Sequence, residues 1–159
     1  MPESTDKQVS LRLLMIEDNP DDEALVLRAI RKGGFNVEHI RVDNSNDLLS
    51  VLRNKDWDVV LSDYQMPEFI GLAALKIVKD RNKDLPFIIV SGTIGEEVAV
   101  EAMRSGAQDY LMKDNLTRLV PAIRRELADA DERRALRLSL IHISEPTRPP
   151  LLSRMPSSA

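Results

Sequence analysis

Short apolar runs alternate with amphipathic stretches between residues 11 and 137 of the chain. Each run is bounded by polar residues and is too short for a buried helix, which is typical of strands buried on both faces. We expect strands at Leu11–Ile16, Asn36–Val42, Trp57–Leu61, Leu85–Val90 and Asp109–Met112.

Helix start and stop signals lie in the intervals between these runs. Apolar residues recur there at spacings of three and four, which is typical of helices packed on one side. We expect helices from Asn19-Pro20 to Gly33-Gly34, at Asp43–Asn54 and Gly71–Asp80, along Ile94, Val98 and Ala102, and from Asn115 onward. Strands that alternate with helices predict right-handed crossovers and an α/β fold: a doubly wound, five-stranded parallel sheet with five helices.

The last predicted helix carries a heptad pattern and a charged extension. Its apolar residues are Leu116, Val120, Ile123, Leu127 and Ala130. Pro121 falls early in this helix, so we expect an irregular first turn. The extension RELADADERRALR is typical of a solvated helix end or of a signalling helix that leads into another domain. The heptad weakens at Arg134, so a homodimer through this helix stays a hypothesis.

Composition narrows the class of protein. The chain has 159 residues, of which 43% are hydrophobic and 30% charged, and a net charge of -4. The absence of cysteine excludes disulfide scaffolds, cysteine nucleophiles and cysteine-type zinc sites. No apolar run is long enough to span a membrane, the N-terminus carries no signal sequence, and the acidic charge argues against a nucleic-acid binder. We therefore expect a small cytoplasmic domain that binds neither membrane nor nucleic acid.

The two ends of the chain differ from its middle. We interpret residues 1–10 as a disordered leader, 11–128 as the folded domain and 129–137 as the start of a linker or signalling helix. Residues 138–159 contain four of the nine prolines. Their segments LSLIHISEPTR and SRMPSSA resemble translated adapters of sequencing libraries, in the order of a library end. We therefore interpret 138–159 as non-native, and the chain as a truncated fragment whose natural part ends near Arg137.

Candidate chemistry gathers where the predicted strands end. The first strand is followed by Glu17-Asp18, the third by Asp63, the fourth by Ser91 and the fifth by Lys113. Because ligands of open parallel sheets bind beyond the carboxyl ends of the strands, we expect these side chains to face one crevice. Each residue alone is typical of a turn or cap. The ordered set is what favours a functional site.

Three carboxylates in one crevice repel each other unless a cation neutralises them. Oxygen ligands without cysteine or histidine favour Mg²⁺ or Mn²⁺. A carboxylate beside a metal ion, an ammonium and a hydroxyl is suited to attack phosphorus and to hold the transferred group. Asp63 is the best candidate nucleophile, because Glu17 and Asp18 are adjacent and suited to the metal.

These residues resemble the receiver domain of two-component response regulators, a flavodoxin-like fold, from about Leu11 to Leu127. Glu17-Asp18 matches the metal-binding pair of that family, with Glu in place of the commoner first Asp. Asp63 in SDYQMPEFIGL matches the phosphoacceptor, with Pro67 and Gly71 at the spacing typical of the family. Ser91 in IIVSGT takes the place of the switch hydroxyl. Tyr110 in GAQDYLMK occupies the aromatic switch position before Lys113, the family's lysine.

The resemblance implies a mechanism. The phosphohistidine of a histidine kinase or a histidine phosphotransfer protein would donate to Asp63. Mg²⁺ would be held by Glu17, Asp18, Asp63 and the backbone carbonyl of Gln65. Ser91 and Lys113 would then bind the phosphoryl oxygens, and Tyr110 would swing inward and remodel the face of the fourth helix, fifth strand and fifth helix. The module would be a phosphoprotein switch in a phosphorelay, limited to self-phosphotransfer and autodephosphorylation, and not a turnover enzyme.

Several points stay open at this stage. Asp114 follows Lys113 where many family members have proline, so we expect the loop to differ. Gln65 and Thr93 flank the dephosphorylation path and are expected to tune the phosphoryl lifetime. The end of the chain is similar to receivers that precede PAS and histidine-kinase modules, which makes a hybrid sensor protein the preferred parent.

Two other functions compete with the switch. A degenerate receiver would act only as a protein-docking module, but it would lack the acids, Ser91 or Lys113. A Mg²⁺-dependent aspartyl-phosphate phosphohydrolase of the haloacid-dehalogenase type would carry Asp-x-Asp after the first strand. That position reads Glu17-Asp18-Asn19.

Overall fold

The computed structural model describes residues 8–64, 71–92 and 96–143. Within these residues the elements follow one another as β1 (Val9–Ile16), α2 (Pro20–Lys32), β2 (Phe35–Val42), α3 (Ser45–Asn54), β3 (Val59–Ser62), α4 (Gly71–Arg81), β4 (Phe87–Ser91), α5 (Glu96–Arg104), β5 (Asp109–Met112), the 3-10 helix η1 (Leu116–Arg118) and α6 (Leu119–Ile143). The chain divides into two compact units, one through Leu127 and one from Ala128. None of the helices in the described part is long and apolar enough to cross a bilayer.

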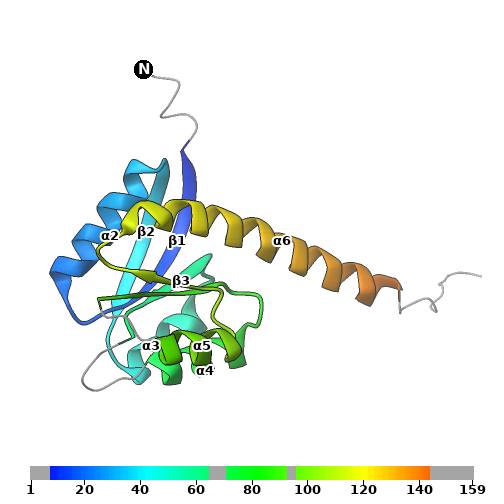
Figure 1. Ribbon diagram of the computed structural model, residues 1–159. Helices are drawn as coiled ribbons and strands as arrows, with labels where there is room; N and C mark the ends of the chain where they lie inside the picture. The colour runs from blue at the N-terminus through cyan, green and yellow to red at the C-terminus, as the bar shows by residue number, and fades with distance from the viewer. Residues whose placement is uncertain (1–7, 65–70, 93–95, 144–159) are drawn as a thin grey trace, which may run out of the picture. The chain divides into compact units, whose positions relative to one another are not determined.

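The five strands form one parallel sheet in the order β2-β1-β3-β4-β5 (Figure 1). The order reverses between β1 and β3, because β1 lies between β2 and β3. This arrangement confirms the predicted doubly wound, flavodoxin-like fold. In such sheets the crevice at the switch point lies beyond the carboxyl ends of the strands. The fold therefore brings the end of β1 beside the end of β3.

Alternating strand residues supply two cores, one on each face of the sheet. Leu13 and Met15 of β1 belong to the core beneath α2 and the first part of α6. Leu14 and Ile16 belong to the core beneath α3, α4 and α5. Figure 1 shows these three helices grouped along one side of the sheet, in cyan and green. Because both faces are covered, β3 and β4 consist of buried and almost wholly apolar residues, as the sequence predicts, whereas the edge strand β2 alternates apolar and polar residues.

Several predicted boundaries shift. β1 begins at Val9, two residues inside the predicted leader, because the Val9 N–H donates to the Gly34 carbonyl and Val9 pairs with Phe35. β4 begins at Phe87 rather than Leu85. Pro86 has no N–H to donate, although its carbonyl accepts from Val60.

The irregular start predicted for the last helix is observed as η1, which precedes α6. α6 continues to Ile143, past the expected end of the natural sequence near Arg137. The heptad residues Leu116, Val120, Ile123 and Leu127 pack with the core under α6. These residues cover the sheet, so a homodimer through α6 would have to use others.

Candidate functional site

Two buried carboxylates and one exposed carboxylate meet at the ends of β1 and β3. One oxygen each from Glu17, Asp18 and Asp63 can be chosen so that all three lie within 4.8 Å of one another. Glu17 is 3% exposed and Asp63 7% exposed, while Asp18 is open to solvent. The Asp63 N–H donates to the Ile16 carbonyl at 2.8 Å, which ties β3 to β1 beside the site. The sequence prediction that these three carboxylates converge is met by the geometry.

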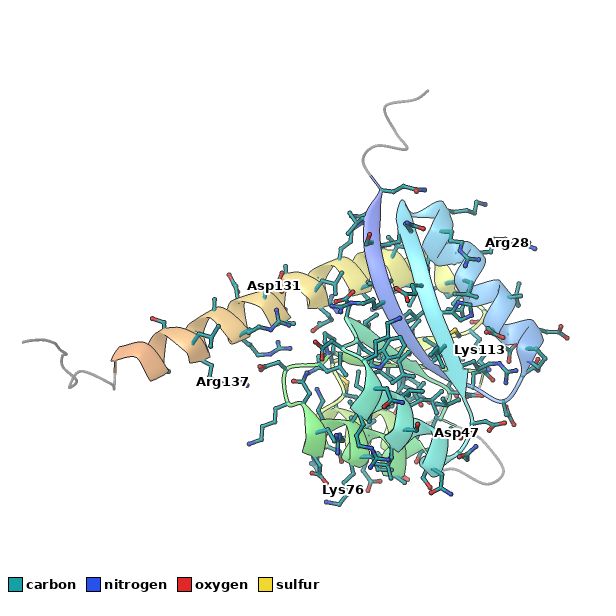
Figure 2. The ribbon with its side chains drawn as sticks, turned by 180° about the vertical axis from the view of Figure 1, so that it is seen from behind. Arg28, Asp47, Lys76, Lys113, Asp131 and Arg137 are labelled. Atoms are coloured by element: carbon teal, nitrogen blue, oxygen red, sulfur yellow. The ribbon has the colours of Figure 1, made fainter. Side chains whose placement is uncertain are left out.

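The Lys113 ammonium lies among the carboxylates. Its Nζ is 3.1 Å from Glu17 Oε1, 3.1 Å from Asp63 Oδ2 and 2.5 Å from Asp22 Oδ2. The residue follows β5, and its side chain reaches the first turn of α2 (Figure 2). One cation therefore compensates acids contributed by three separate segments of the chain.

Burial and charge shift two pKa values in the site. Burial raises the pKa of Glu17 from 4.5 to about 7; its hydrogen bond to Lys113 acts in the opposite direction, and the Asp63 charge adds to the rise. Burial lowers the pKa of Lys113, but hydrogen bonds to Asp22, Asp63 and Glu17 outweigh it and raise that pKa above its ordinary value. The ammonium therefore stays charged at neutral pH, whereas Glu17 is poised to bind or release a proton.

Neighbouring polar groups fix the turn that carries the acidic pair. The Asn19 side chain caps α2 by accepting from the Asp21 N–H at 2.8 Å, and the Asn19 N–H donates to Glu17 Oε2 at 3.2 Å. On the other side, Arg41 Nη1 donates to the Glu17 backbone carbonyl at 3.1 Å. Glu23 holds the Arg41 guanidinium through Oε1 at 2.9 Å. These contacts orient Glu17 before any ligand binds.

Ser91 lies on β4, next to the strand that precedes Asp63, and Tyr110 lies on β5, one strand further along the sheet. Ser91 ends β4 and is fully buried, and its carbonyl accepts from the Lys113 N–H at 2.8 Å. Tyr110 lies in β5, half-buried, and packs against the core under α3, α4 and α5. The fold thus places Tyr110 on the strand that precedes Lys113 and Ser91 on the neighbouring strand. The Lys113–Asp114 peptide is trans.

Some predicted residues lie outside the described part of the chain. Gln65, Pro67 and Thr93 are among them, whereas Gly71 is the first residue of α4. The predicted backbone ligand and the residues expected to tune phosphoryl lifetime therefore stay predictions.

Asp22 is the site residue that sequence reasoning missed. The sequence places Asp22 in the first turn of a predicted helix, where acids are common, and that position alone does not indicate a site. No local signal in the sequence points to its partner, because Lys113 is 91 residues away along the chain. Its contact with Lys113 places it in the site.

The donor set fits a hard divalent cation. All three clustered ligand atoms are carboxylate oxygens, which Mg²⁺ and Mn²⁺ prefer. Two of the carboxylates are almost fully buried, so their mutual repulsion is larger than it would be in water. A bound cation would relieve that repulsion.

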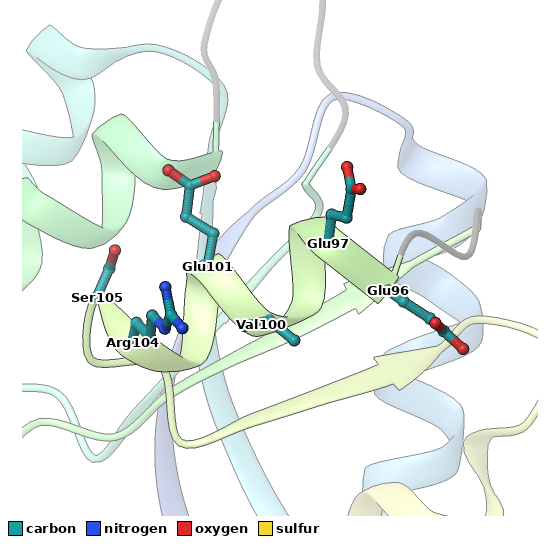
Figure 3. Close-up of a pocket in the computed structure, with 6 residues that line it drawn as sticks. All are labelled: Glu96, Glu97, Val100, Glu101, Arg104 and Ser105. Carbon is teal, nitrogen blue, oxygen red and sulfur yellow. The ribbon is translucent and has the colours of Figure 1, made fainter.

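A separate hollow lies on the outer surface of α5 (Figure 3). Its lining residues are Glu96, Glu97, Val100, Glu101, Arg104 and Ser105. They all come from this helix and the residue after it, and none belongs to the acidic site. The hollow is a feature of the helix surface and supplies no group to the chemistry at the strand ends.

Comparison with known families identifies the family to which the fold belongs. The family model of the response regulator receiver domain matches residues 13–124, which include both the acidic pair Glu17-Asp18 and Lys113. The chain belongs to the receiver domain family. It is thus a response-regulator module of two-component signalling, and receivers as a class are regulatory phosphoacceptors.

Named relatives agree with this assignment. The receiver is 34% identical over 121 residues to the transcriptional regulatory protein ZraR of Salmonella typhimurium, covering 75% of the chain and 27% of ZraR. It is 36% identical over 99 residues to the DNA-binding transcriptional regulator NtrC of the same organism, covering 62% of the chain and 21% of NtrC. The chain therefore spans about a quarter of the length of these curated relatives.

Solved structures show the same fold. The apo receiver domain of nitrogen regulatory protein C superposes with a TM-score of 0.63 at 32% identity, covering 75% of this chain and 95% of that one. NtrX from Brucella abortus, in complex with ADP, superposes with a TM-score of 0.72 at 25% identity, covering 80% of this chain and 29% of NtrX. The receiver fold of this chain is thus shared with both regulators.

Proposed function

We propose that Asp63 accepts a phosphoryl group from the phosphohistidine of a histidine kinase or a histidine phosphotransfer protein. The observation that carries this proposal is the contact of 3.1 Å between Lys113 Nζ and Asp63 Oδ2, inside a cluster of carboxylates with the geometry of a cation site. A carboxylate oxygen of Asp63 attacks phosphorus, and the bond from phosphorus to the imidazole nitrogen breaks. The electron pair leaves with the imidazole.

Glu17, Asp18, Asp63 and the Gln65 carbonyl would hold Mg²⁺ or Mn²⁺. When bound, the metal ion neutralises charge on the phosphoryl oxygens during transfer. Burial of Glu17 and Asp63 keeps bulk water away from most of the acceptor's surroundings. Because Glu17 has a pKa of about 7 in the metal-free protein, its proton is released when the cation binds at lower pH.

Lys113 and Ser91 would bind the phosphoryl oxygens after transfer. The Lys113 ammonium already lies at the acceptor oxygen, so it needs only a small displacement to reach a new phosphoryl oxygen. Tyr110 would then move inward and remodel the face of α5, β5 and α6. The hydrogen bond from Lys113 to the Ser91 carbonyl supports this coupling, because it ties the lysine to the strand of the switch hydroxyl.

The setting of the switch is part of the proposal. A cytoplasmic kinase pathway suits a receiver whose described helices include no membrane span. The proposed parent is a hybrid sensor protein in which a PAS or histidine-kinase module follows α6. The relatives named as DNA-binding regulators offer a different output, and this chain itself is not proposed to contact nucleic acid.

Beryllofluoride, which mimics the phosphoryl group, tests the proposal without a kinase. We would record ¹H–¹⁵N NMR spectra of the chain with and without beryllofluoride, each with Mg²⁺ and with EDTA. The proposal requires shifts near Asp63, Ser91 and Tyr110 that need Mg²⁺ and vanish in Asp63→Asn. Unchanged spectra would favour a receiver that acts only as a docking module.

A further inference from the structure

Asp22 makes the shortest contact of the Lys113 ammonium. Its Oδ2 lies 2.5 Å from Nζ, whereas Glu17 and Asp63 each lie at 3.1 Å. Asp22 also differs from those two residues in its surroundings, because its side chain is 26% exposed while theirs are 4% and 7% exposed. Among the described residues that pair with the lysine, Asp22 is therefore the one on the solvent side of the site.

Metal binding and phosphorylation would involve only two of the three carboxylates that contact Lys113. An ammonium has three N–H groups, and here three carboxylates surround it. Glu17 and Asp63 belong to the carboxylate set that fits a cation, and Asp63 is also the proposed phosphoacceptor. Neither the metal site nor the phosphoryl transfer makes a demand on Asp22.

The backbone around Asp22 is fixed independently of the ligand. Asp22 lies in the first turn of α2, where the Asn19 side chain accepts from the N–H groups of Asp21 and Asp22. A carboxylate on a capped helix is a stable point from which to hold a flexible lysine side chain. Holding a lysine side chain in one position costs side-chain entropy, and the contact with Asp22 compensates part of that cost before the phosphoryl group arrives.

We propose that Asp22 is the positioning residue that keeps the Lys113 ammonium at the site when Glu17 and Asp63 are taken up by the cation and the phosphoryl group. The inference rests on the proposed function. Two N–H groups of the ammonium become available to phosphoryl oxygens, while the third stays with Asp22. Asp22 itself touches neither the metal ion nor phosphorus, and it acts through the lysine.

The test is the affinity for beryllofluoride, read by ¹⁹F NMR of the bound adduct in the full chain. The Mg²⁺ affinity of each variant is measured first, so that all titrations run at saturating metal. Asp22→Asn keeps the side chain's shape but removes its charge, and we expect it to weaken the adduct about tenfold. Asp22→Glu restores the carboxylate, and we expect it to recover most of that loss.

Asp21→Asn is the matched control, because Asp21 is exposed in the same helical turn and carries the same charge. It should leave the affinity unchanged if the effect comes from contact with Lys113 rather than from the helix terminus. Thermal unfolding of all variants verifies that they fold.

The outcomes separate this inference from the function on which it rests. Wild-type affinity in Asp22→Asn, equal losses in Asp21→Asn and Asp22→Asn, or no recovery in Asp22→Glu would each overturn the role of Asp22 while leaving the phosphoacceptor intact. If the wild-type chain forms no adduct, the proposed function falls, and the inference falls with it.

Discussion

At the residue scale, the site holds more buried negative charge than its single lysine balances. Glu17 and Asp63 are both nearly inaccessible to water, and Lys113 is the cation shared between them. Burial disfavours the charged form of a carboxyl group, which is why Glu17 has a raised pKa. The metal-free site is therefore a source of instability that a bound cation would remove.

The raised pKa of Glu17 predicts how stability changes with pH in the metal-free protein. The folded state holds this proton up to about pH 7, whereas the unfolded chain releases it near 4.5, so the free energy of unfolding falls as pH rises between these values. Glu17→Gln should therefore stabilise the protein at pH 8 by about 2 kcal/mol more than at pH 5. Urea unfolding in EDTA measures the difference.

The exposed Glu97→Gln variant serves as the control for Glu17→Gln, since it removes the same charge from the surface of α5. An equal effect of Glu17→Gln at both pH values would show that the folded state does not hold the proton.

Replacement of Lys113 should lower the free energy of unfolding, because it removes the positive charge that compensates the buried carboxylates. Lys113→Met leaves the Glu17 and Asp63 carboxylates without their cation, and removing one partner of a buried ion pair costs about 3 kcal/mol or more. Adding Asp63→Asn to this variant should recover part of the loss, because one buried charge disappears. Urea unfolding of the single and double variants at pH 8 tests this coupling. Strictly additive changes would mean that Lys113 and Asp63 do not share an interaction.

At the scale of elements, the site depends on turns that the strands and helices hold in place. α2 matters most, because its first turn carries Asp22 and its last turn packs against α6. A Cβ on Gly33 would lie 2.5 Å from Val120 Cγ2. The end of α2 therefore approaches α6 so closely that a larger residue at position 33 fits only if Val120 shifts.

The contact between Gly33 and Val120 predicts a specific rescue. Gly33→Ala should destabilise the receiver by about 2 kcal/mol through overpacking. Val120→Ala in the same chain should remove much of that cost, because the two atoms nearest to the added Cβ, at 2.5 and 2.7 Å, are the Val120 methyl groups. Chemical unfolding of the four chains of this cycle gives the coupling energy. Gly92→Ala is the control, since its Cβ would lie 3.9 Å from Lys113.

How far the sequence predicts these elements depends on how local the determining interactions are. The strands could be predicted because burial on both faces gives continuous apolar runs, and Glu17, Asp18 and Asp63 follow from where those runs end. The start of β1 at Val9 could not, because pairing with Phe35 across the sheet determines it. The place of Asp22 in the site could not be predicted for a similar reason, since its partner Lys113 is 91 residues away.

The heptad of the last helix shows where a pattern has two meanings. Spacings of four and three suit a coiled coil and also a helix that covers a sheet. Ile123 is fully buried, and Leu116 and Leu127 are partly buried in the core of the receiver. Only the position of the sheet separates the two meanings, and a sequence pattern does not contain that information.

At the scale of the whole molecule, the chain contains a receiver and a last helix whose residues continue past the family match. The family match ends at residue 124, while α6 continues to Ile143. In the second unit, Arg134 pairs with Asp131 at 3.0 Å along the helix. The described residues 138–140 at the start of the adapter-like segment are exposed.

Removal of residues 138–159 should therefore leave the receiver unaffected. A chain that ends at Arg137 is expected to unfold within about 1 °C of the full chain, because the described residues 138–140 are exposed and exposed terminal residues contribute little to stability. Differential scanning calorimetry in EDTA measures both chains. A drop of several degrees would mean that the adapter-like segment stabilises the folded receiver.

The central claim is that Asp63 takes up a phosphoryl group, and intact mass spectrometry tests it most directly. The chain is incubated with acetyl phosphate and Mg²⁺, beside Asp63→Asn and beside a sample with EDTA. The account predicts a gain of about 80 Da only in the wild-type chain with Mg²⁺, since formation of one acyl phosphate adds one HPO₃ unit to the Asp63 side chain. An unchanged wild-type mass, or an equal gain in Asp63→Asn, would contradict it.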